Sequence, residues 1–188
     1  MELSNLDGQL IGIVSDDFKK EEYSNKLVKD IILVKQNEAI KMVKLDKDVL
    51  SKNFDDLSSR DQNKVILASK LHDKEIILIN FSKGMITKDL EYFKSLFKKI
   101  STYNRKIVLI DKNANLFLNC VDNIYVISNN NLIFHTTDIF DRVLDIYIDP
   151  PKIVEFFHKC ENLGIRLDHY KELDELLKAI YRIKSWDI

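Results

Sequence analysis

Glycine and proline are scarce in this chain, which has four and two of them among its 188 residues. A phosphate cradle needs clustered glycines before a helix N-terminus, so that backbone N–H groups can reach the phosphate. Gly8 and Gly12 are the only neighbouring pair, and the sequence holds no GxxxxGK[ST] run. The residues by themselves therefore indicate no phosphate-binding loop.

Cysteine and long apolar runs are also lacking. The two cysteines, Cys120 and Cys160, lie in apolar surroundings and are predicted to be small buried hydrophobes without a disulfide. Residues 1–7 do not resemble a signal peptide, and no stretch approaches the ~20 apolar residues of a membrane span. These patterns predict a cytoplasmic protein, or one held at the inner face of a membrane through a partner.

Neither sign of charge is in excess, since 29 Lys and Arg stand against 30 Asp and Glu. The net charge of -1 gives no electrostatic reason to expect nucleic acid or an acidic membrane as a partner. The length suits one domain with a small appendage. A chain of this size buries roughly 70% of its unfolded surface and needs no metal or disulfide to fold.

Short apolar runs alternate with helical patterns along most of the chain. Residues 10–14, 76–79 and 107–110 are rich in Ile, Val and Leu, which favours buried strands of a parallel sheet covered on both faces. An amphipathic helix is predicted after Thr87, and Ser58 with Asp61 predicts the start of another, which runs to about residue 71. This order is typical of a doubly wound α/β domain.

In the last third of the chain the alternation of strands and helices gives way to a predicted hairpin and then to helices. Residues 123–127 and 132–135 predict two strands of a hairpin joined at Asn129 and Asn130, because asparagine tolerates the left-handed conformation of a tight turn. From about residue 141 the pattern is helical. One helix is expected after residues 149–151 and before Gly164, and another over about 171–183. The predicted units are residues 1–140 and 141–188.

No active site emerges from the residues alone. His158 and Cys160 flank Lys159 on a predicted helix, where this spacing points their side chains apart, so a surface histidine and a buried cysteine are favoured over a metal site. No nucleophile turn is visible. The acidic pairs are read as solvated turns and caps; they are Asp16–Asp17, Glu21–Glu22 and Asp55–Asp56. Neither a cofactor nor a metal is expected.

Motifs in the middle of the chain are more specific when they are taken in order. Residues 57–61 read LSSRD and residues 62–71 read QNKVILASKL. They are similar to the LSGGQ signature and the KQRVALARAL helix of ABC transporter ATP-binding subunits, in particular the energy-coupling-factor group. Residues 76–79 stand where that family has its Walker B strand. Residues 84–87 resemble its D-loop, and residues 107–110 the strand before its switch histidine.

Both ends of the chain resemble the same family. Residues 12–16, continuing to residue 31, are similar to its Q-loop region, which implies that the P-loop strand, the P-loop and its helix are missing. In the family that strand lies between the switch strand and the next one. Residues 107–110 are therefore expected to pair directly with 124–127, or to leave an exposed edge. The start and end of the first C-terminal helix resemble the family's tail. The implied fold is P-loop-NTPase-like: a mainly parallel sheet lacking the P-loop strand, with a β-hairpin and a helical C-terminal appendage.

The resemblance also implies that the residues needed for ATP hydrolysis are replaced. Asn80 stands at the Walker B aspartate and is a poorer metal partner, while Phe81 stands at the general-base glutamate and cannot take a proton. A missing base alone typically costs about 10²–10⁴-fold in rate. The family's Q-loop glutamine, signature glycines, D-loop aspartate and switch histidine correspond to Asp16, Ser59 and Arg60, Thr87 and Lys112, with Ser58 and Asp61 completing the degenerate signature.

The resemblance therefore predicts a non-catalytic protein. It would be a regulatory or structural partner of an active ABC ATPase or of a transporter membrane subunit. Its contact surface is expected at Asp16, Asp17, Phe18 and Tyr23, although Phe18 and Tyr23 have the alternative of packing against the sheet. Two other functions stay open: a freestanding protein-binding or scaffold module, which would form a homodimer through a sheet edge, and a truncated paralogue without a role in transport. No convergent acid, base or nucleophile supports a new kind of enzyme.

Overall fold

The structure is a computed structural model and describes residues 2–18, 22–32, 37–71, 76–80, 87–103, 105–111 and 114–184. Its strands are β1 (Leu10–Val14), β2 (Ile76–Asn80), β3 (Lys106–Ile110), β4 (Asn123–Ser128) and β5 (Asn131–Thr136). Its α-helices are α1 (Val28–Ile31), α2 (Asn37–Met42), α3 (Ser59–Lys70), α4 (Thr87–Ser101), α5 (Lys152–Asn162) and α6 (Leu173–Lys184). Short 3₁₀ helices cover Leu3–Asn5, Lys47–Ser51, Phe54–Asp56, Ala114–Leu116 and Leu144–Ile146.

The five strands form one sheet in the order β2-β3-β1-β4-β5. The first four are parallel, and β5 pairs antiparallel with β4. The predicted α/β class with a mainly parallel sheet and a hairpin is therefore confirmed. The expected pairing of residues 107–110 with 124–127 is wrong, because β1 lies between β3 and β4. All five residues of β1 are buried, as expected of an apolar strand at the centre of a sheet.

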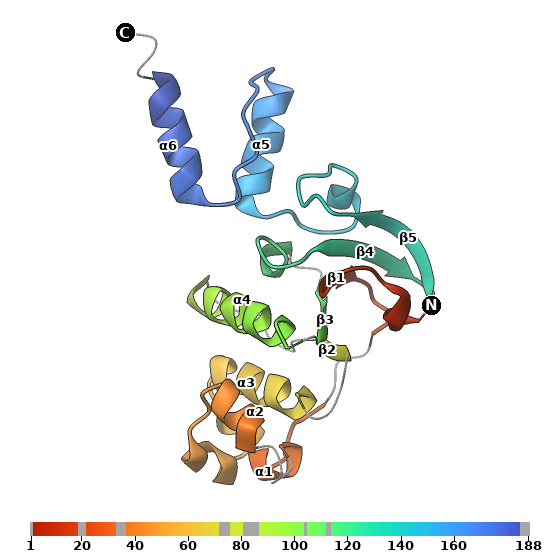
Figure 1. Cartoon of the computed structure of the whole chain (residues 1–188), viewed down its shortest axis with the longest axis vertical. Helices are drawn as coiled ribbons and strands as arrows, with labels where there is room; N and C mark the ends of the chain where they lie inside the picture. The colour runs from red at the N-terminus through yellow and green to blue at the C-terminus, as the bar shows by residue number, and fades with distance from the viewer. Residues whose placement is uncertain are drawn as a thin grey trace.

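One face of the sheet is covered by helices. The helix α3 packs against β2, and α4 packs against β1 and β3 (Figure 1). The opposite face holds a second apolar cluster, in which Ile11, Ile13 and Val108 are fully buried beneath the N-terminal residues Leu3 and Leu6. Within the described ranges no α-helix contributes to this second cluster, so the expected doubly wound arrangement is not found there.

Local sequence signals correctly predicted where several helices and turns begin and end. The Ser58 hydroxyl accepts a hydrogen bond from the backbone N–H of Asp61 at 3.1 Å and caps α3 as predicted. Asn129 and Asn130 adopt φ values of 50° and 60° between β4 and β5, which confirms the predicted turn. Gly164 follows α5 with a φ of 75°, in the left-handed region that glycine favours.

A lone glycine in β1 makes room for an aromatic ring. A Cβ atom on Gly12 would lie 3.1 Å from ring carbons of Phe117, whose side chain is 1% exposed. Phe117 follows the 3₁₀ helix after β3 and packs across the centre of the sheet. The close approach of the Phe117 ring to the backbone thus explains why residue 12 is a glycine. A role in binding phosphate is not needed to explain it.

The C-terminal helices share the core of the sheet. Val154 and Phe157 of α5 and Leu176 of α6 belong to the cluster that α3 and α4 form with the sheet. The helical texture predicted after residue 141 is confirmed, while the boundary between two units stays a prediction. None of the helices in the described part of the chain is both long and apolar enough to cross a bilayer.

His158 is not the surface residue that its spacing suggested. Its side chain is 6% exposed, with Nδ1 2.8 Å from Asp145 Oδ2 and Nε2 2.9 Å from the carbonyl oxygen of Phe140. The spacing rule assigns faces of an isolated helix, but α5 packs this face onto residues 138–146. Cys120 and Cys160 are buried and unpaired, as predicted.

Candidate functional site

The carboxyl ends of the parallel strands form the edge at which open α/β sheets usually bind ligands. The loop of residues 15–18 leaves β1 at this edge, and Asn80 is the last residue of β2. In the family that the sequence resembles, the P-loop strand lies between the switch strand and the next strand. The strand β1 has this place, between β3 and β4. By position, β1 therefore has the place that the resemblance gives to the P-loop strand, which differs from the expected match of residues 12–16 to the Q-loop.

Three hydrogen bonds fix the loop after β1. The Ser15 hydroxyl accepts from the N–H of Asp17 at 3.1 Å. The Asp17 carboxylate accepts from the N–H of Asn130 in the hairpin turn at 2.9 Å. Asn80 Nδ2 donates to the carbonyl oxygen of Phe18 at 3.2 Å. The loop is therefore held at one side to the hairpin and at the other to the end of β2.

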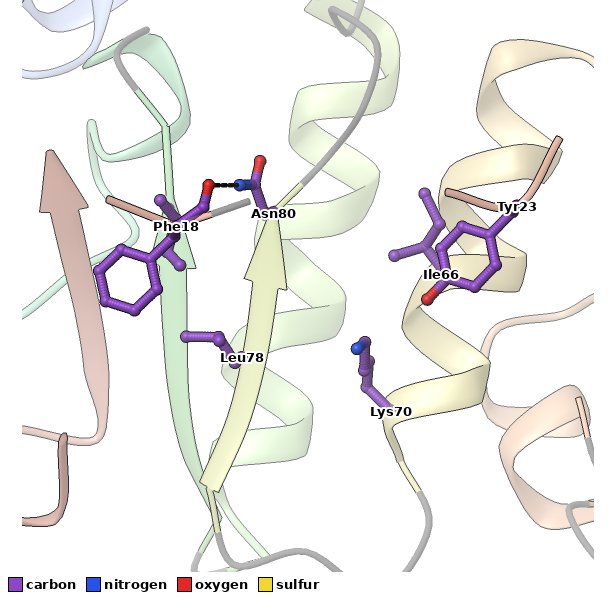
Figure 2. A pocket seen from close by; sticks show the side chains of 7 residues that line it. Phe18, Tyr23, Ile66, Lys70, Leu78 and Asn80 are labelled. Carbon is purple, nitrogen blue, oxygen red and sulfur yellow. Dashed lines mark hydrogen bonds between the residues drawn. The ribbon is translucent and has the colours of Figure 1, made fainter. Parts of the chain in front are cut away.

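A small pocket lies between this loop, β2 and α3 (Figure 2). Its volume is about 30 Å³, whereas ligand pockets usually have about 300–1,000 Å³. Figure 2 shows Phe18 and Asn80 joined above the end of β2, with Tyr23 beside Ile66 of α3. The lining is mostly apolar, and it consists of Phe18, Tyr23, Ile66, Lys70, Leu78, Asn80 and Ile110.

Phe18 and Tyr23, two of the four residues expected at a partner surface, are half-buried. Phe18 packs on the second face of the sheet, and the Tyr23 ring lies 5.4 Å from that of Phe54. Burial raises the pKa of the Tyr23 hydroxyl, and a hydrogen bond with Ser69 partly offsets this. The alternative of packing is thus observed for these two, whereas Asp16 and Asp17 are exposed.

The degenerate signature residues lie where α3 meets α4. The Arg60 guanidinium stacks 4.7 Å from the centre of the Tyr92 ring, and its Nε lies 3.4 Å from Asp89 Oδ1. The Tyr92 hydroxyl donates to the carbonyl oxygen of Val43 at 2.7 Å. Burial raises the pKa of Tyr92. Arg60, which the resemblance matches to a signature glycine, thus connects two helices with its side chain.

The remaining predicted residues are not brought into one site. Phe81, Lys112 and Glu21 lie outside the described residues, and Thr87 is the first residue of α4. Asp55 accepts from the N–H of Asn25 at 2.7 Å, as expected of a carboxylate in a turn. Across the described ranges no group of three or more His, Cys, Asp or Glu side chains could hold a metal ion.

Sequence reasoning missed the contacts that close the loop. The bonds from Asn80 to Phe18 and from Asn130 to Asp17 join residues 62 and 113 positions apart, so no local pattern announces them. Gly12 was the one residue whose type hinted at tertiary packing, because a glycine inside an apolar strand often marks the close approach of another group to the backbone.

No family model matches the chain. Among curated proteins, the chain is 26% identical over 138 residues to the energy-coupling factor transporter ATP-binding protein EcfA2 of Mycoplasma capricolum subsp. capricolum. The match covers 69% of this chain and 48% of the relative. The chain thus spans about half the length of the curated relative it matches.

Solved structures share the fold at low sequence identity. An ATP-binding cassette of an ABC transporter matches with a TM-score of 0.52 and 15% identity, over 78% of this chain and 68% of that one. A dimeric ATP-binding cassette in a post-hydrolysis state, bound to ADP and Pi, matches with a TM-score of 0.50 and 18% identity, over 73% and 70%. In sequence the chain is thus similar to an ABC transporter ATP-binding protein, and in fold it is similar to ABC ATP-binding cassettes.

Proposed function

We propose that this chain is a non-catalytic ABC ATPase-like protein that serves as a regulatory or structural partner in a transporter complex. The observation that carries the proposal is the loop of residues 15–18. It follows the strand that has the P-loop strand's place, yet it is closed by its own contacts with Asn80 and Asn130.

A phosphate group would meet an unfavourable environment at this loop. P-loops present several backbone N–H groups, helped by glycines and by a lysine. Residues 15–18 read SDDF, with no glycine and with two exposed carboxylates, Asp16 and Asp17. The N–H of Asp17 is already bonded to the Ser15 hydroxyl. The lack of glycine and the occupied N–H of Asp17 therefore leave few backbone donors for an anion.

Magnesium and water activation also lack suitable groups at the end of β2. In P-loop NTPases a Walker B aspartate helps to hold Mg²⁺. Asn80 is neutral at this position, and its amide is bonded to the loop. Phe81, which follows it, carries no group that can accept a proton. These substitutions support a protein that does not hydrolyse ATP.

A transporter partner is supported by the kind of relative that the chain resembles. The curated relative is a transporter ATP-binding protein, and one matched cassette is dimeric. The chain keeps this fold while the catalytic positions differ, which favours a role in assembly. An active ABC ATPase or a membrane subunit of the transporter is the proposed partner. Asp16 and Asp17 are proposed as contact residues because both side chains are exposed at this edge of the sheet.

A protein-binding module outside transport is the second candidate, and β5 favours it. This strand has β4 as its neighbour at the end of the sheet, and Leu132 and Ile133 are 49% and 50% exposed. Its sequence, NLIFHT, has no Lys, Glu or Pro of the kind that protects edge strands. An exposed strand of this kind can accept a strand from another protein.

Purification of the tagged chain from detergent-solubilised membranes of its host distinguishes the two candidates. Recovery with an ABC ATPase or a transporter membrane subunit supports the transporter role. Recovery without either contradicts it and leaves the binding module. In the same experiment, Asp16→Lys should lower recovery of the partner, while Glu38→Lys, an exposed reversal on α2, should not.

A further inference from the structure

A cavity of about 350 Å³ lies between α6 and the segment that leads to it from α5. Ligand pockets usually have about 300–1,000 Å³. Residues 163–172 run back along α5 to the start of α6, which stands beside them (Figure 1). The cavity shares no lining residue with the small pocket at the end of β2. Its lining consists of Arg166, Leu167, Asp168, Tyr170, Ala179 and Arg182.

Both walls of this cavity are held in place by the rest of the fold. On one side, the His169 ring stacks on the Phe140 ring with 4.3 Å between their centroids, which fixes the segment after α5. On the other side, Leu176 of α6 is 4% exposed and part of the core. Asn119 donates a hydrogen bond to the carbonyl oxygen of Lys171, just before α6, at 3.3 Å. A ligand would therefore meet walls that are already ordered, which lowers the entropic cost of binding.

The lining combines apolar side chains with two guanidinium groups. Leu167 and Tyr170 are half-buried and pack against the main core. Arg166 comes from the segment after α5 and Arg182 from α6, and both are exposed. A guanidinium presents its N–H donors in a planar fork that matches the two oxygens of a carboxylate. The cavity therefore suits a molecule with an apolar body and an anionic head.

The charge of the lining favours a head with a single negative charge. Asp168 is the third charged residue of the lining, so two positive groups stand against one negative group. One carboxylate balances this difference. A phosphate group carries about −1.5 to −2 charges at pH 7 and would leave excess negative charge beside Asp168. A carboxylate therefore fits the cavity better than a phosphate or a nucleotide.

We propose that this cavity binds a small organic monocarboxylate with an aromatic or branched apolar body. The carboxylate head is held by Arg166 and Arg182. The apolar body packs on Tyr170 and Leu167, beside Ala179. Such a site adds the binding of a small molecule to the C-terminal part of the chain, away from the carboxyl edge of the sheet.

An NMR titration of the isotope-labelled full chain with phenylacetate tests this site. We expect saturable binding with a Kd of about 1 mM, which is typical of so small a ligand. Acetate lacks the ring and benzyl alcohol lacks the charge, so each should bind at least about tenfold more weakly. Phenyl phosphate should also bind more weakly, because of its second charge. Tighter binding of phenyl phosphate than of phenylacetate would overturn the choice of a carboxylate.

Three variants separate the head of the ligand from its body. Arg166→Gln and Arg182→Gln each remove a guanidinium, and each should weaken phenylacetate binding about tenfold. Ala179→Leu fills part of the cavity without changing the charge, and it should raise the Kd at least as much. Lys178→Gln is the matched control. It removes an exposed cation at the preceding position of α6, outside the lining, and should leave the Kd unchanged.

Far-UV circular dichroism and the unfolding midpoint establish that each variant is folded. The arginine variants change exposed side chains, so they keep the test decisive if Ala179→Leu lowers stability. A wild-type chain without saturable phenylacetate binding up to about 10 mM overturns the proposal, since this is tenfold above the expected Kd. Binding that all three variants leave unchanged overturns it as well, because the ligand then occupies another surface. Neither result bears on the transporter role.

Discussion

The side-chain amide of Asn80 donates a hydrogen bond to the backbone carbonyl oxygen of Phe18 over 3.2 Å. This contact joins the end of β2 to the loop after β1, two strands away in the sheet. It gives a structural use to Asn80, which the resemblance matches to a metal-binding aspartate of P-loop ATPases. Asp17 and Arg60 also make structural contacts, Asp17 with the N–H of Asn130 and Arg60 with the Tyr92 ring.

Restoring the aspartate should weaken the protein without giving it activity. In Asn80→Asp a carboxylate replaces the donor and faces the carbonyl oxygen of Phe18, so two acceptors meet at a half-buried site. We expect a loss of about 1–3 kcal/mol in the free energy of unfolding, measured by urea denaturation. Asn80→Ala, which removes the donor without adding charge, should cost less. Equal stability of wild type and Asn80→Asp would show that the bond does not hold the loop.

Gly12→Ala should destabilise the centre of the sheet. The added Cβ lies 3.1 Å from the Phe117 ring, and β1 is flanked by strands on both sides, so the backbone cannot move away easily. We expect a cost of about 1–3 kcal/mol in the urea midpoint and extrapolated stability. The double variant Gly12→Ala/Phe117→Leu removes the clash and should cost less than the sum of the two single variants. Additive costs would contradict the close packing.

Arg60→Gly introduces the glycine that the resemblance expects at this position, and it should also destabilise the fold. The change removes the stacking on Tyr92 and the contact with Asp89, and it adds the helix cost of glycine. We expect a loss of about 1–2 kcal/mol in thermal or urea unfolding. Ser59→Gly, at the preceding residue of α3, carries the glycine cost without these contacts. If both variants lose the same stability, Arg60 does not join α3 to α4.

Titration of the buried Cys120 thiol should lower the free energy of unfolding at alkaline pH. Burial raises the pKa of its thiol from 9.0 to about 11, with the nearby Lys94 and Lys98 opposing the shift. Between these values the unfolded chain releases the proton and the folded chain keeps it, so the free energy of unfolding falls as pH rises. Below about pH 9 the thiol is neutral in both states and makes no difference.

Urea denaturation across pH 8 to 11 measures this dependence. The slope above pH 9 should be smaller in Cys120→Ala, whose titrating thiol is gone. The native thiol should also react slowly with a thiol reagent at pH 8, because little thiolate is present. Fast labelling of Cys120 in the native protein would contradict its burial.

The sequence predicted the elements better than their arrangement. Local features such as the Ser58 cap and the Asn129–Asn130 turn were found because each acts within a few residues. The place of β1 was missed, since the order of strands depends on pairings with β3 and β4 that lie about 100 residues away. His158 was misplaced for the same reason, because its partners Asp145 and Phe140 belong to a segment before α5.

The order of the motifs predicted which residues stand at the ATPase positions. It did not predict the contacts that these residues make. Motif order placed Asn80 at the Walker B aspartate, and no pattern suggested that its amide would reach Phe18. Likewise the resemblance placed Arg60 at a glycine, while its stacking on Tyr92 required the packing of two helices. The sequence matched residues 12–16 to the Q-loop, whereas in the sheet β1 lies between β3 and β4, the place that the resemblance gives to the P-loop strand.

Binding of Mg-ATP to the purified chain, followed by isothermal titration calorimetry with phosphate release assayed on the same sample, tests the central claim most directly. The closed loop at residues 15–18 predicts no binding heat at millimolar nucleotide, no phosphate release, and no rise in the unfolding temperature. Saturable binding that Asp16→Lys or Asn80→Ala alters would place a nucleotide at this edge of the sheet. Turnover that changes with these two substitutions would contradict a non-catalytic protein.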